Sequence, residues 1–564
     1  MVFECAETWG RHFLASHAEK CNLPSVYSSL TAEPPTPISY AASPADLADC
    51  PLPNYKPRTP IHVDRFAAAL ESHPNQALVA WAVACLRHGA RLGYTGERRS
   101  VLHRNHGSAT RFASALADDI RGGLQSGRLV ALSSLPKRVW VSPLGVVPKP
   151  RSDKFRTITN FAYPDNDSIN DRIVCAPTHY DRLDSLLPWL RAYGTRAFVA
   201  GVDIADAFRI IPVHASDLWL HALSFEGKFY IDTSLVFGCK SSPVIFNTIA
   251  SLLAWIVYTQ RQMHCILHYL DDFITVAPDR PSAVRDDAAL RATFSLLGVP
   301  LKTSKCYSPC QMATHLGFRI DTIRGRVSFL PTKIEDILSV MSRIMAKPLR
   351  NKETTHLIGW LLHACSVSPR LRPCITILQW LERDGDADIP TDFPLAMAFA
   401  EDILKSHPFV DIYRSATWRS SDDTVTLFTD ATPVRGGYWC PFLNLFATFP
   451  LPQLATIHLS EAYALYTAIF HTGPLLRHRS LAVFVDNNAL FHAFRHGASR
   501  DPPLNRFILL IFRLLFRFDI DVHLFWIPSE ENIEADLLSR NKLEWLLARH
   551  PTAVIDRPGL PPFQ

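Results

Sequence analysis

The chain has 564 residues, 48% of them hydrophobic and 20% charged, and its formal net charge is +5. This length exceeds what one hydrophobic core supports, so we expect three or four domains, and the composition excludes a disordered chain. The mild basic excess is compatible with binding a phosphate backbone but does not demonstrate it. The most apolar segment, residues 507–518, is interrupted by Arg513 and Arg517. We therefore expect no uncharged membrane-spanning run and no membrane partner.

The cysteine pattern predicts reduced thiols. The chain has 12 cysteines, and most are scattered singly without regular spacing. Because no secretory signal is seen at the N-terminus, this usage indicates an intracellular protein, in the cytoplasm or in the nucleus. Cys306 and Cys310 with His315 lack a fourth ligand, so buried thiols are favoured over a zinc site.

Changes in composition and periodicity divide the chain into segments. Residues 1–58 are rich in proline, serine and alanine without periodicity, which is typical of a flexible leader. Basic side chains then gather in one loop, which is either solvated or in contact with phosphate: Arg98, Arg99, Arg104 and His106. We expect a helical region over 59–130, a strand-rich block over 131–330, helices over 331–418, a second strand-rich block over 419–542 and a tail over 543–564.

The helical segment after residue 330 has a clear predicted start. Thr332 and Glu335 are spaced as a capping box, in which each side chain binds the backbone amide of the other residue. An apolar stripe follows at helical spacing from Ile334 to Met345. This stripe is typical of a helix that packs on a core.

Two adjacent carboxylates, Asp271 and Asp272, follow Tyr269-Leu270 between apolar runs at residues 263–267 and 273–277. The pattern predicts a β-hairpin with both acids at its tip. Asp-Asp is also ordinary in solvated turns. A rigid tip that carries two carboxylates suits a hard divalent cation such as Mg²⁺.

A third acid, Asp203, ends a predicted buried strand over residues 198–202. Nucleotidyl transfer requires acids from two places in the chain to converge on two metal ions. We therefore expect Asp203 and Asp271 to be metal ligands, with Asp272 a less direct member of the same catalytic set.

These stretches resemble motifs A and C of reverse transcriptases. Residues 237–247 look like motif B of that family, and residues 141–156 resemble its fingers hairpin. The resemblance implies a set of substrate-binding residues: Asp206 beside the triphosphate, Phe208 facing the sugar and excluding a 2′-hydroxyl, Gly238 in the template and nucleotide pocket, Lys149 and Arg156 on the triphosphate, and Lys305 as general acid for pyrophosphate. Core packing stays open as the alternative for Phe208, as do surface turn positions for Lys149 and Arg156.

Four further acids lie in the second strand-rich block. Asp430 and Asp486 end apolar strands, Glu461 lies in the first turn of a helix, and Asp536 lies on a late helix. Each choice is ordinary alone. In this order they resemble the ribonuclease H fold, which implies that the four acids hold two Mg²⁺ ions and activate water. Residues 526–528, Trp-Ile-Pro, depart from the Gly-His-rich loop of cellular members, so we assign no catalytic histidine.

Shorter stretches extend the resemblance to the polymerase polyproteins of retroelements, most of all to the tyrosine-recombinase (DIRS-type) group: residues 59–65, 168–171, 357–365, 497–502 and 535–540. The implied fold is a multidomain α+β and α/β protein. A right-hand polymerase would place fingers and palm in residues 131–330 and a thumb or connection in residues 331–418. A ribonuclease H-like domain would follow in residues 419–542.

The implied function is RNA- and DNA-directed DNA synthesis with a linked RNA–DNA hybrid ribonuclease. Both activities would use two Mg²⁺ ions per site, with Mn²⁺ as a substitute. The implied partners are an RNA template, a DNA primer, the RNA–DNA hybrid and dNTPs. A recombinase of the same element would be encoded separately, or this chain would be a fragment. The alternative is a decayed or co-opted relic that binds nucleic acid without synthesis.

Overall fold

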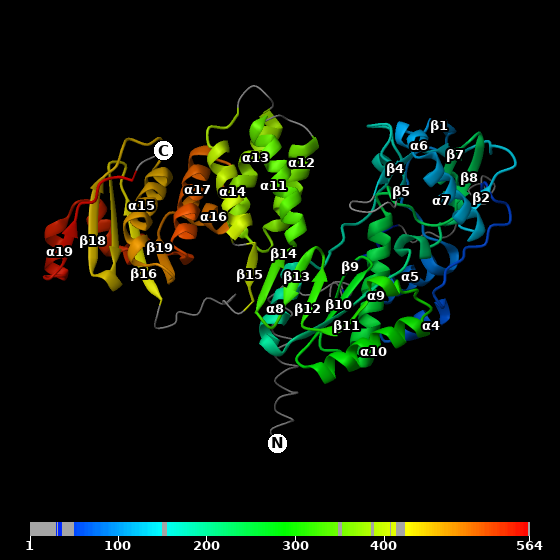
Figure 1. Ribbon diagram of the computed structural model, residues 1–564, viewed down its shortest axis with the longest axis horizontal. Helices are drawn as coiled ribbons and strands as arrows, with labels where there is room; N and C mark the ends of the chain where they lie inside the picture. The colour runs from blue at the N-terminus through cyan, green and yellow to red at the C-terminus, as the bar shows by residue number, and fades with distance from the viewer. Residues whose placement is uncertain are drawn as a thin grey trace, which may run out of the picture. The chain divides into compact units, whose positions relative to one another are not determined.

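The computed structural model describes residues 30, 32–36, 50–148, 155–347, 352–384, 389–406, 408–412 and 424–561. The chain forms two compact units, the first made of residues 1–316 and 320–325 and the second of residues 317–319 and 326–564. Figure 1 labels the elements of both units. Strands β12 (Met312–His315) and β13 (Phe318–Asp321) lie along the stretch where the chain passes from one unit to the other.

The first unit begins with helices followed by a five-stranded sheet of order β1-β3-β7-β8-β2, beside a separate hairpin of β4 and β5. The bounds are α4 (Val63–Ala69), α5 (Gln76–His88), α6 (Gly107–Arg111), α7 (Ala113–Gln125), β1 (Val101–Leu102), β2 (Leu129–Ala131), β3 (Trp140–Val141), β4 (Leu144–Pro148), β5 (Phe155–Thr159), β7 (Ala222–Phe225) and β8 (Lys228–Asp232). Arg99, from the basic loop, bonds to both carboxylate oxygens of Asp167 at 2.6 Å and lies over the ring of Trp140.

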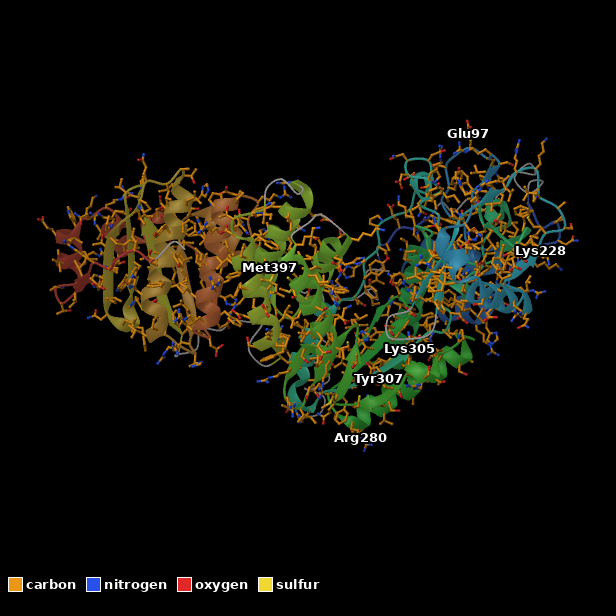
Figure 2. All side chains as sticks on the ribbon, turned by 45° about the horizontal axis from the view of Figure 1, so that its top comes forward. Glu97, Lys228, Arg280, Lys305, Tyr307 and Met397 are labelled. Atoms are coloured by element: carbon orange, nitrogen blue, oxygen red, sulfur yellow. The ribbon has the colours of Figure 1, made fainter. Side chains whose placement is uncertain are left out.

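A four-stranded sheet of order β11-β6-β10-β9 forms the centre of the first unit. Its elements and their neighbours are β6 (Phe198–Asp203), β9 (Ile266–Tyr269), β10 (Asp272–Ala277), β11 (Tyr307–Cys310), α8 (Leu183–Tyr193), α9 (Ser242–Arg261), α10 (Arg280–Leu296), η3 (Ala207–Ile210) and η5 (Thr303–Lys305). Gly201 of β6 admits the ring of Tyr307, since a Cβ there would lie 2.3 Å from Tyr307 Cε1. Tyr307 is labelled in Figure 2, two residues from Lys305. Strand β6 is buried along almost its whole length. This burial explains why the sequence that predicts β6 is a continuous apolar run.

Helix α9 corrects one expectation from the sequence. It is 20 residues long and apolar enough to cross a membrane by length and composition, so the statement that no run reaches that length was wrong. Within the first unit 83% of its apolar window is buried, and α9 packs on α5, α10 and β9. An all-round apolar helix is what a central position in a protein core requires.

The second unit opens with strands β14 (Arg326–Phe329) and β15 (Phe409–Asp411), which pair antiparallel, and with four helices. These are α11 (Pro331–Ala346), α12 (Lys352–Ala364), α13 (Arg372–Asp384) and α14 (Phe393–Ser406). The helical expectation for this region is confirmed, but the predicted capping box at Thr332 is not. Leu330 is the N-cap without a side-chain bond, and Pro331 occupies the first turn, where its missing N–H costs nothing.

A six-stranded sheet of order β20-β19-β16-β17-β18-β21 follows. Its elements are β16 (Val425–Ala431), β17 (Arg435–Cys440), β18 (Leu445–Pro450), β19 (Ser480–Val485), β20 (Asp521–Trp526), β21 (Val554–Asp556), α15 (Ile457–Thr472), α16 (Asn488–His496), α17 (Pro502–Arg517), α18 (Ile533–Ser539) and α19 (Leu543–Arg549). Strands β16 and β17 pair antiparallel, whereas β19 pairs parallel to both β16 and β20. The expected tail over 543–564 was wrong, because α19 packs on α18 and β21 extends the sheet beside β18.

Candidate active sites

The paired acids lie at the tip of a tight hairpin, as the sequence predicts. Strands β9 and β10 are joined by Leu270 and Asp271 alone, because Tyr269 and Asp272 are already paired across the ladder. Leu270 takes the left-handed conformation with φ +53°, which two-residue hairpin loops demand. Asp271 therefore projects from the turn itself and Asp272 from the first residue of β10.

The register of the central sheet brings Asp203 to the same place. Asp203 lies opposite Asp272 in the antiparallel pair of β6 and β10. Beyond the ladder, Ile204 N donates to Asp271 O at 3.0 Å, which ties the turn to the end of β6. Asp203 is buried, and Asp271 and Asp272 are partly buried. The convergence of acids from two places in the sequence is thus a property of the fold.

The electrostatics of this cluster are those of crowded carboxylates. Burial and the neighbouring charges of Asp271 and Asp203 raise the pKa of Asp272 to about 6. Burial, together with Asp203, also raises the pKa of Asp271. One cation partly offsets the repulsion, because Lys305 Nζ lies 2.6 Å from Asp203 Oδ2. Lys305, expected near the leaving pyrophosphate, is thus bound to a candidate metal ligand here.

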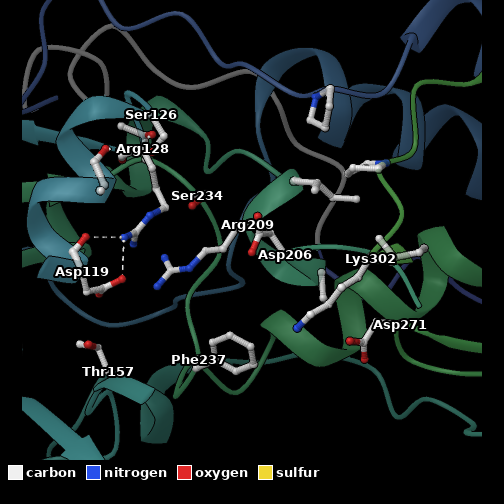
Figure 3. Close-up of a pocket in the computed structure, with 18 of the residues that line it drawn as sticks. Asp119, Ser126, Arg128, Thr157, Asp206, Arg209, Ser234, Phe237, Asp271 and Lys302 are labelled. Carbon is white, nitrogen blue, oxygen red and sulfur yellow. Dashed lines mark hydrogen bonds and ion pairs between the residues drawn. The ribbon is translucent and has the colours of Figure 1, made fainter. Parts of the chain in front are cut away.

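A cavity of about 1110 Å³ opens beside these acids, and Figure 3 shows many of the residues that line it. Asp203, Asp271 and Lys305 lie in its wall, and the expected substrate residues Asp206 and Arg156 line it too. The remaining charged residues of the wall carry both signs: Arg58, Asp118, Asp119, Arg128, Arg209 and Lys302. Among the described residues, Asp271 and not Asp272 belongs to the lining.

Phe208 lies two residues after Asp206 in a short turn. Asp206 adopts the left-handed conformation with φ +56°, and its carbonyl oxygen accepts a hydrogen bond from Arg209 N at 2.6 Å. The Phe208 side chain is 6% exposed and packs on Phe237 and Phe246, with ring centroids 4.8 and 5.7 Å apart. Among the described residues, it is Phe237 and not Phe208 that lines the cavity. The ring of Phe208 is therefore packed in the core, which is the alternative that the sequence left open, and it contacts the ring of Phe237.

Gly238 and Arg156 flank the same wall. Gly238 has φ +108°, and a Cβ would lie 2.1 Å from Thr159 O, so no larger residue fits there. Asn170 holds this loop by donating to Gly238 O and accepting from Lys240 N, both at 2.8 Å. The Arg156 guanidinium lies 5.4 Å from the centroid of the Phe237 ring. Lys149, the other expected triphosphate ligand, lies outside the described residues.

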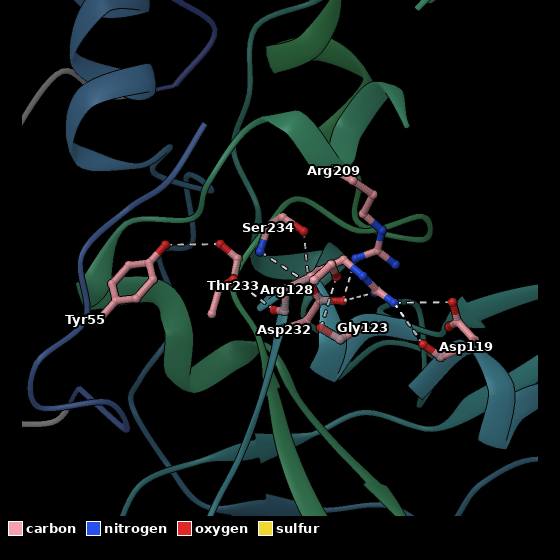
Figure 4. A network of polar contacts seen from close by, with 9 residues as sticks. Tyr55, Asp119, Gly123, Arg128, Arg209, Asp232, Thr233 and Ser234 are labelled. Carbon is pink, nitrogen blue, oxygen red and sulfur yellow. Dashed lines mark hydrogen bonds and ion pairs between the residues drawn. The ribbon is translucent and has the colours of Figure 1, made fainter. Parts of the chain in front are cut away.

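A buried ion-pair network at one side of the cavity was not anticipated from the sequence (Figure 4). Asp232 Oδ2 accepts from Arg209 Nη1 at 2.5 Å and from Arg128 Nη1 at 2.9 Å. Ser234 donates to the other carboxylate oxygen. Burial alone would raise the pKa of Asp232, but the two guanidinium groups lower it. An Asp at a strand end near two distant arginines carries no local signal, so only the fold reveals this network.

The second acidic cluster lies on the six-stranded sheet. Asp430 is the penultimate residue of β16, and Asp486 directly follows β19. Glu461 is the fifth residue of α15, just beyond the first turn in which the sequence predicts it. One carboxylate oxygen from each lies within 4.8 Å of the others, and among the described residues this is the one group of three or more such ligands that could hold a metal ion. Because β16 and β19 are parallel neighbours, their C-terminal ends place Asp430 and Asp486 side by side.

Burial and mutual repulsion dominate the electrostatics of this cluster, although the charge of Arg540 offsets part of the effect at Asp430. Burial and the charges of Asp486 and Asp536 raise the pKa of Asp430 to about 6, although the bond from Ser539 opposes the shift. Burial and the charges of Asp430 and Asp486 raise the pKa of Glu461 well above its usual range. Glu461 Oε2 is buried and has no hydrogen-bond partner among the described residues. An all-oxygen ligand set with an unpaired buried carboxylate oxygen fits a hard divalent cation.

Asp536, the fourth acid expected here, is held apart from the other three. Its Oδ1 accepts from Arg540 Nε at 2.5 Å, one helical turn along α18. The charge of Asp536 still helps to raise the pKa of Asp430. The structure therefore brings together three of the four acids and pairs the fourth with an arginine.

Comparison with known proteins agrees with the first site. Residues 147–320 match the family described as reverse transcriptase (RNA-dependent DNA polymerase). The chain is 28% identical over 155 residues to the Gag-Pol polyprotein of Walleye dermal sarcoma virus and 23% identical over 212 residues to the Pol polyprotein of Feline endogenous virus ECE1. These regions cover 27% and 36% of this chain, and 8% and 19% of those polyproteins.

Similar solved structures include two of a foamy viral protease-reverse transcriptase. The complex with double-stranded DNA has a TM-score of 0.45 at 14% identity, covering 84% of this chain and 83% of that chain. The complex with an RNA/DNA hybrid has a TM-score of 0.45 at 15% identity, covering 77% and 56%.

The hairpin acids and the opposing Asp203 lie within the residues that match this family. The chain carries a reverse transcriptase domain of the kind found in retroviral and retroelement Pol polyproteins.

Proposed function

We propose that this protein is an RNA- and DNA-directed DNA polymerase with a linked RNA–DNA hybrid ribonuclease. The observation that carries the proposal is the coexistence of two separate acidic sites, one at Asp203 and Asp271 beside a cavity of about 1110 Å³, the other at Asp430, Glu461 and Asp486. Two Mg²⁺ ions at each site, with Mn²⁺ as substitute, would stabilise the charge that develops at the transferred phosphoryl group.

In the proposed polymerase site, some residues would bind the metal ions and others would bind the nucleotide. Asp203 and Asp271 would hold the metal ions, and Asp272 would support Asp203 from the neighbouring strand. Lys305 would leave Asp203 once the ions bind and approach the pyrophosphate. Arg156 and Lys149 would bind the triphosphate of a dNTP, with the Asp206 amide beside it. Phe237, backed by Phe208, would pack on the sugar and favour deoxynucleotides.

In the ribonuclease site Asp430, Glu461 and Asp486 would form the inner ligands. Asp536 would join them by exchanging Arg540 for a metal ion. The substrate is the hybrid of RNA template and extended DNA primer. Cleaving the copied RNA frees the first DNA strand to act as the next template, which gives a reason for both sites to share one chain.

The family context remains a proposal as well. We infer a retrotransposon origin of the DIRS type, action inside the cell, and a recombinase of the same element as a partner. The expected segment limits at residues 58, 130, 330 and 418 are proposed as the boundaries between leader, helical region, fingers with palm, thumb or connection, and ribonuclease domain, and that last domain extends through β21.

The test is a labelled RNA template with a recessed DNA primer, incubated with the full chain, dNTPs and Mg²⁺. Primer extension and RNA cleavage are measured in one reaction for the wild type, Asp271→Asn and Asp430→Asn. We expect Asp271→Asn to lose only extension and Asp430→Asn to lose only cleavage. Folded wild-type protein that binds the hybrid without either reaction would contradict the proposal and indicate a relic.

A further inference from the structure

The segment that begins at the last residue of β20 forms several hydrogen bonds with the proposed ribonuclease-site acids or with residues next to them. Trp526 Nε1 donates to Asp486 O at 2.9 Å, and Ser529 Oγ donates to Asp486 Oδ2 at 2.5 Å. Farther along, Asn532 Nδ2 donates to Thr429 O at 2.9 Å, the residue before Asp430. Ser539 Oγ then donates to Asp430 Oδ2. We call residues 526–539 the clamp segment.

Local structure fixes both ends of the clamp segment. Residues Ser529–Glu531 form a short 3-10 turn, and Ile533–Ser539 form α18. Helix α18 is anchored by Thr448 Oγ1, which donates to Leu538 O at 2.9 Å. It also lies so close to β17 that a Cβ on Gly437 would be 2.5 Å from Leu538 Cβ. Ser539 is 1% exposed whereas Ser529 is exposed.

These bonds act on carboxylates whose own charges repel each other. Without a fixed partner, Asp430 and Asp486 would rotate apart to reduce that repulsion. A hydroxyl donor on one oxygen of each fixes the rotation of the carboxylate plane and leaves the other oxygen available to a metal ion. Such support of metal ligands by neighbouring groups raises metal affinity.

We propose that Ser529 and Ser539 are positioning residues that hold Asp486 and Asp430 in the orientation needed to bind divalent metal. This rests on the proposed ribonuclease function and deepens it. The clamp segment contains the Trp-Ile-Pro stretch that departs from the histidine-bearing loop, and here that part of the chain contributes hydroxyl donors to the metal ligands. Ser539 carries the larger share, because its bond is buried and competes with no water.

The experiment measures Mg²⁺ and Mn²⁺ binding to the full chain by calorimetry, alongside the metal dependence of hybrid cleavage. The variants are Ser529→Ala, Ser539→Ala, Ser529→Thr and Ser539→Thr. Thr448→Val is the matched control, since it removes a hydroxyl bond to the same helix without touching a carboxylate. Asp430→Asn identifies the binding event that belongs to this site, and thermal unfolding of the full chain reports whether each variant is folded.

We expect the alanine variants to raise the half-saturating metal concentration by about 10- to 100-fold, more for Ser539 than for Ser529. The threonine variants and Thr448→Val should resemble the wild type. Unchanged metal affinity in both alanine variants would overturn the proposal. If Ser539→Ala fails to fold, the exposed Ser529→Ala decides by the same criterion.

Failure of the ribonuclease proposal would look different. Wild-type protein that binds metal at this site but cleaves no hybrid would refute the ribonuclease, and the metal affinities would still decide whether the serines position the acids. Absence of any binding event that Asp430→Asn removes would overturn both proposals.

Discussion

Asp203 and Asp272 lie directly opposite each other in the antiparallel pair of β6 and β10, and Asp271 projects from the turn beside them. This pairing places carboxylates from two distant stretches at one edge of a cavity. A slip of this register by one residue would turn the side chains of one strand to the opposite face of the sheet and separate the two acids. The pairing of β6 with β10 therefore determines the position of the acids.

The buried pair of Asp232 and Arg209 supports the wall of that cavity. Asp232→Asn should lower the free energy of unfolding by about 3–5 kcal/mol, because two guanidinium groups would lose their shared counter-charge. Urea denaturation of the full chain measures the change. Asp118→Asn is the control, since Asp118 is an exposed partner of Arg121, and it should change stability little. Equal stability of both variants would contradict the account of this network.

At the second acidic site, a buried carboxylate that binds metal should destabilise the metal-free protein. Asp430→Asn should stabilise the metal-free protein by about 1–3 kcal/mol, because it removes a buried charge whose pKa is raised to about 6. The same variant should lose the stabilisation that Mg²⁺ confers on the wild type. Thermal unfolding with EDTA and with Mg²⁺ measures both effects. A destabilised metal-free variant would show that Asp430 serves packing instead of metal.

The stabilisation of the metal-free protein by Asp430→Asn should increase with pH. An acid whose pKa is raised in the folded state keeps its proton between the unfolded value and the folded value, so stability falls as pH rises through that window. For Asp430 the window runs from 3.8 to about 6. The difference in unfolding free energy between Asp430→Asn and the wild type, measured in EDTA, should therefore be small near pH 4 and reach its maximum above pH 6. A difference independent of pH would contradict the raised pKa.

Much of this architecture can be predicted from the sequence, because the decisive signals are local. The hairpin at Asp271 follows from two apolar runs around two acids, and Asp430 and Asp486 follow from strands that end in aspartate. Those patterns specify strand ends, and parallel or antiparallel pairing then brings the ends together.

The rest depends on contacts that sequence spacing does not reveal. The Arg209 and Arg128 bonds to Asp232, the Ser539 bond to Asp430 and the Lys305 bond to Asp203 join residues far apart in the chain. The segment after residue 542 was misjudged for a related reason, since β21 is a short edge strand whose partner β18 is distant in sequence. The core position of the Phe208 ring likewise becomes visible only when Phe237 and Phe246 surround it.

The central claim is that the carboxylates at the hairpin tip form a polymerase metal site, and primer extension tests it most directly. The purified 564-residue chain is given an RNA template, a DNA primer, dNTPs and Mg²⁺, with Asp271→Asn and the double variant Asp271→Asn, Asp272→Asn in parallel. The account predicts extension by the wild type and none by either variant, with hybrid cleavage retained in all three. Extension that persists in Asp271→Asn, or its absence in wild-type protein that is folded and binds the hybrid, would contradict it.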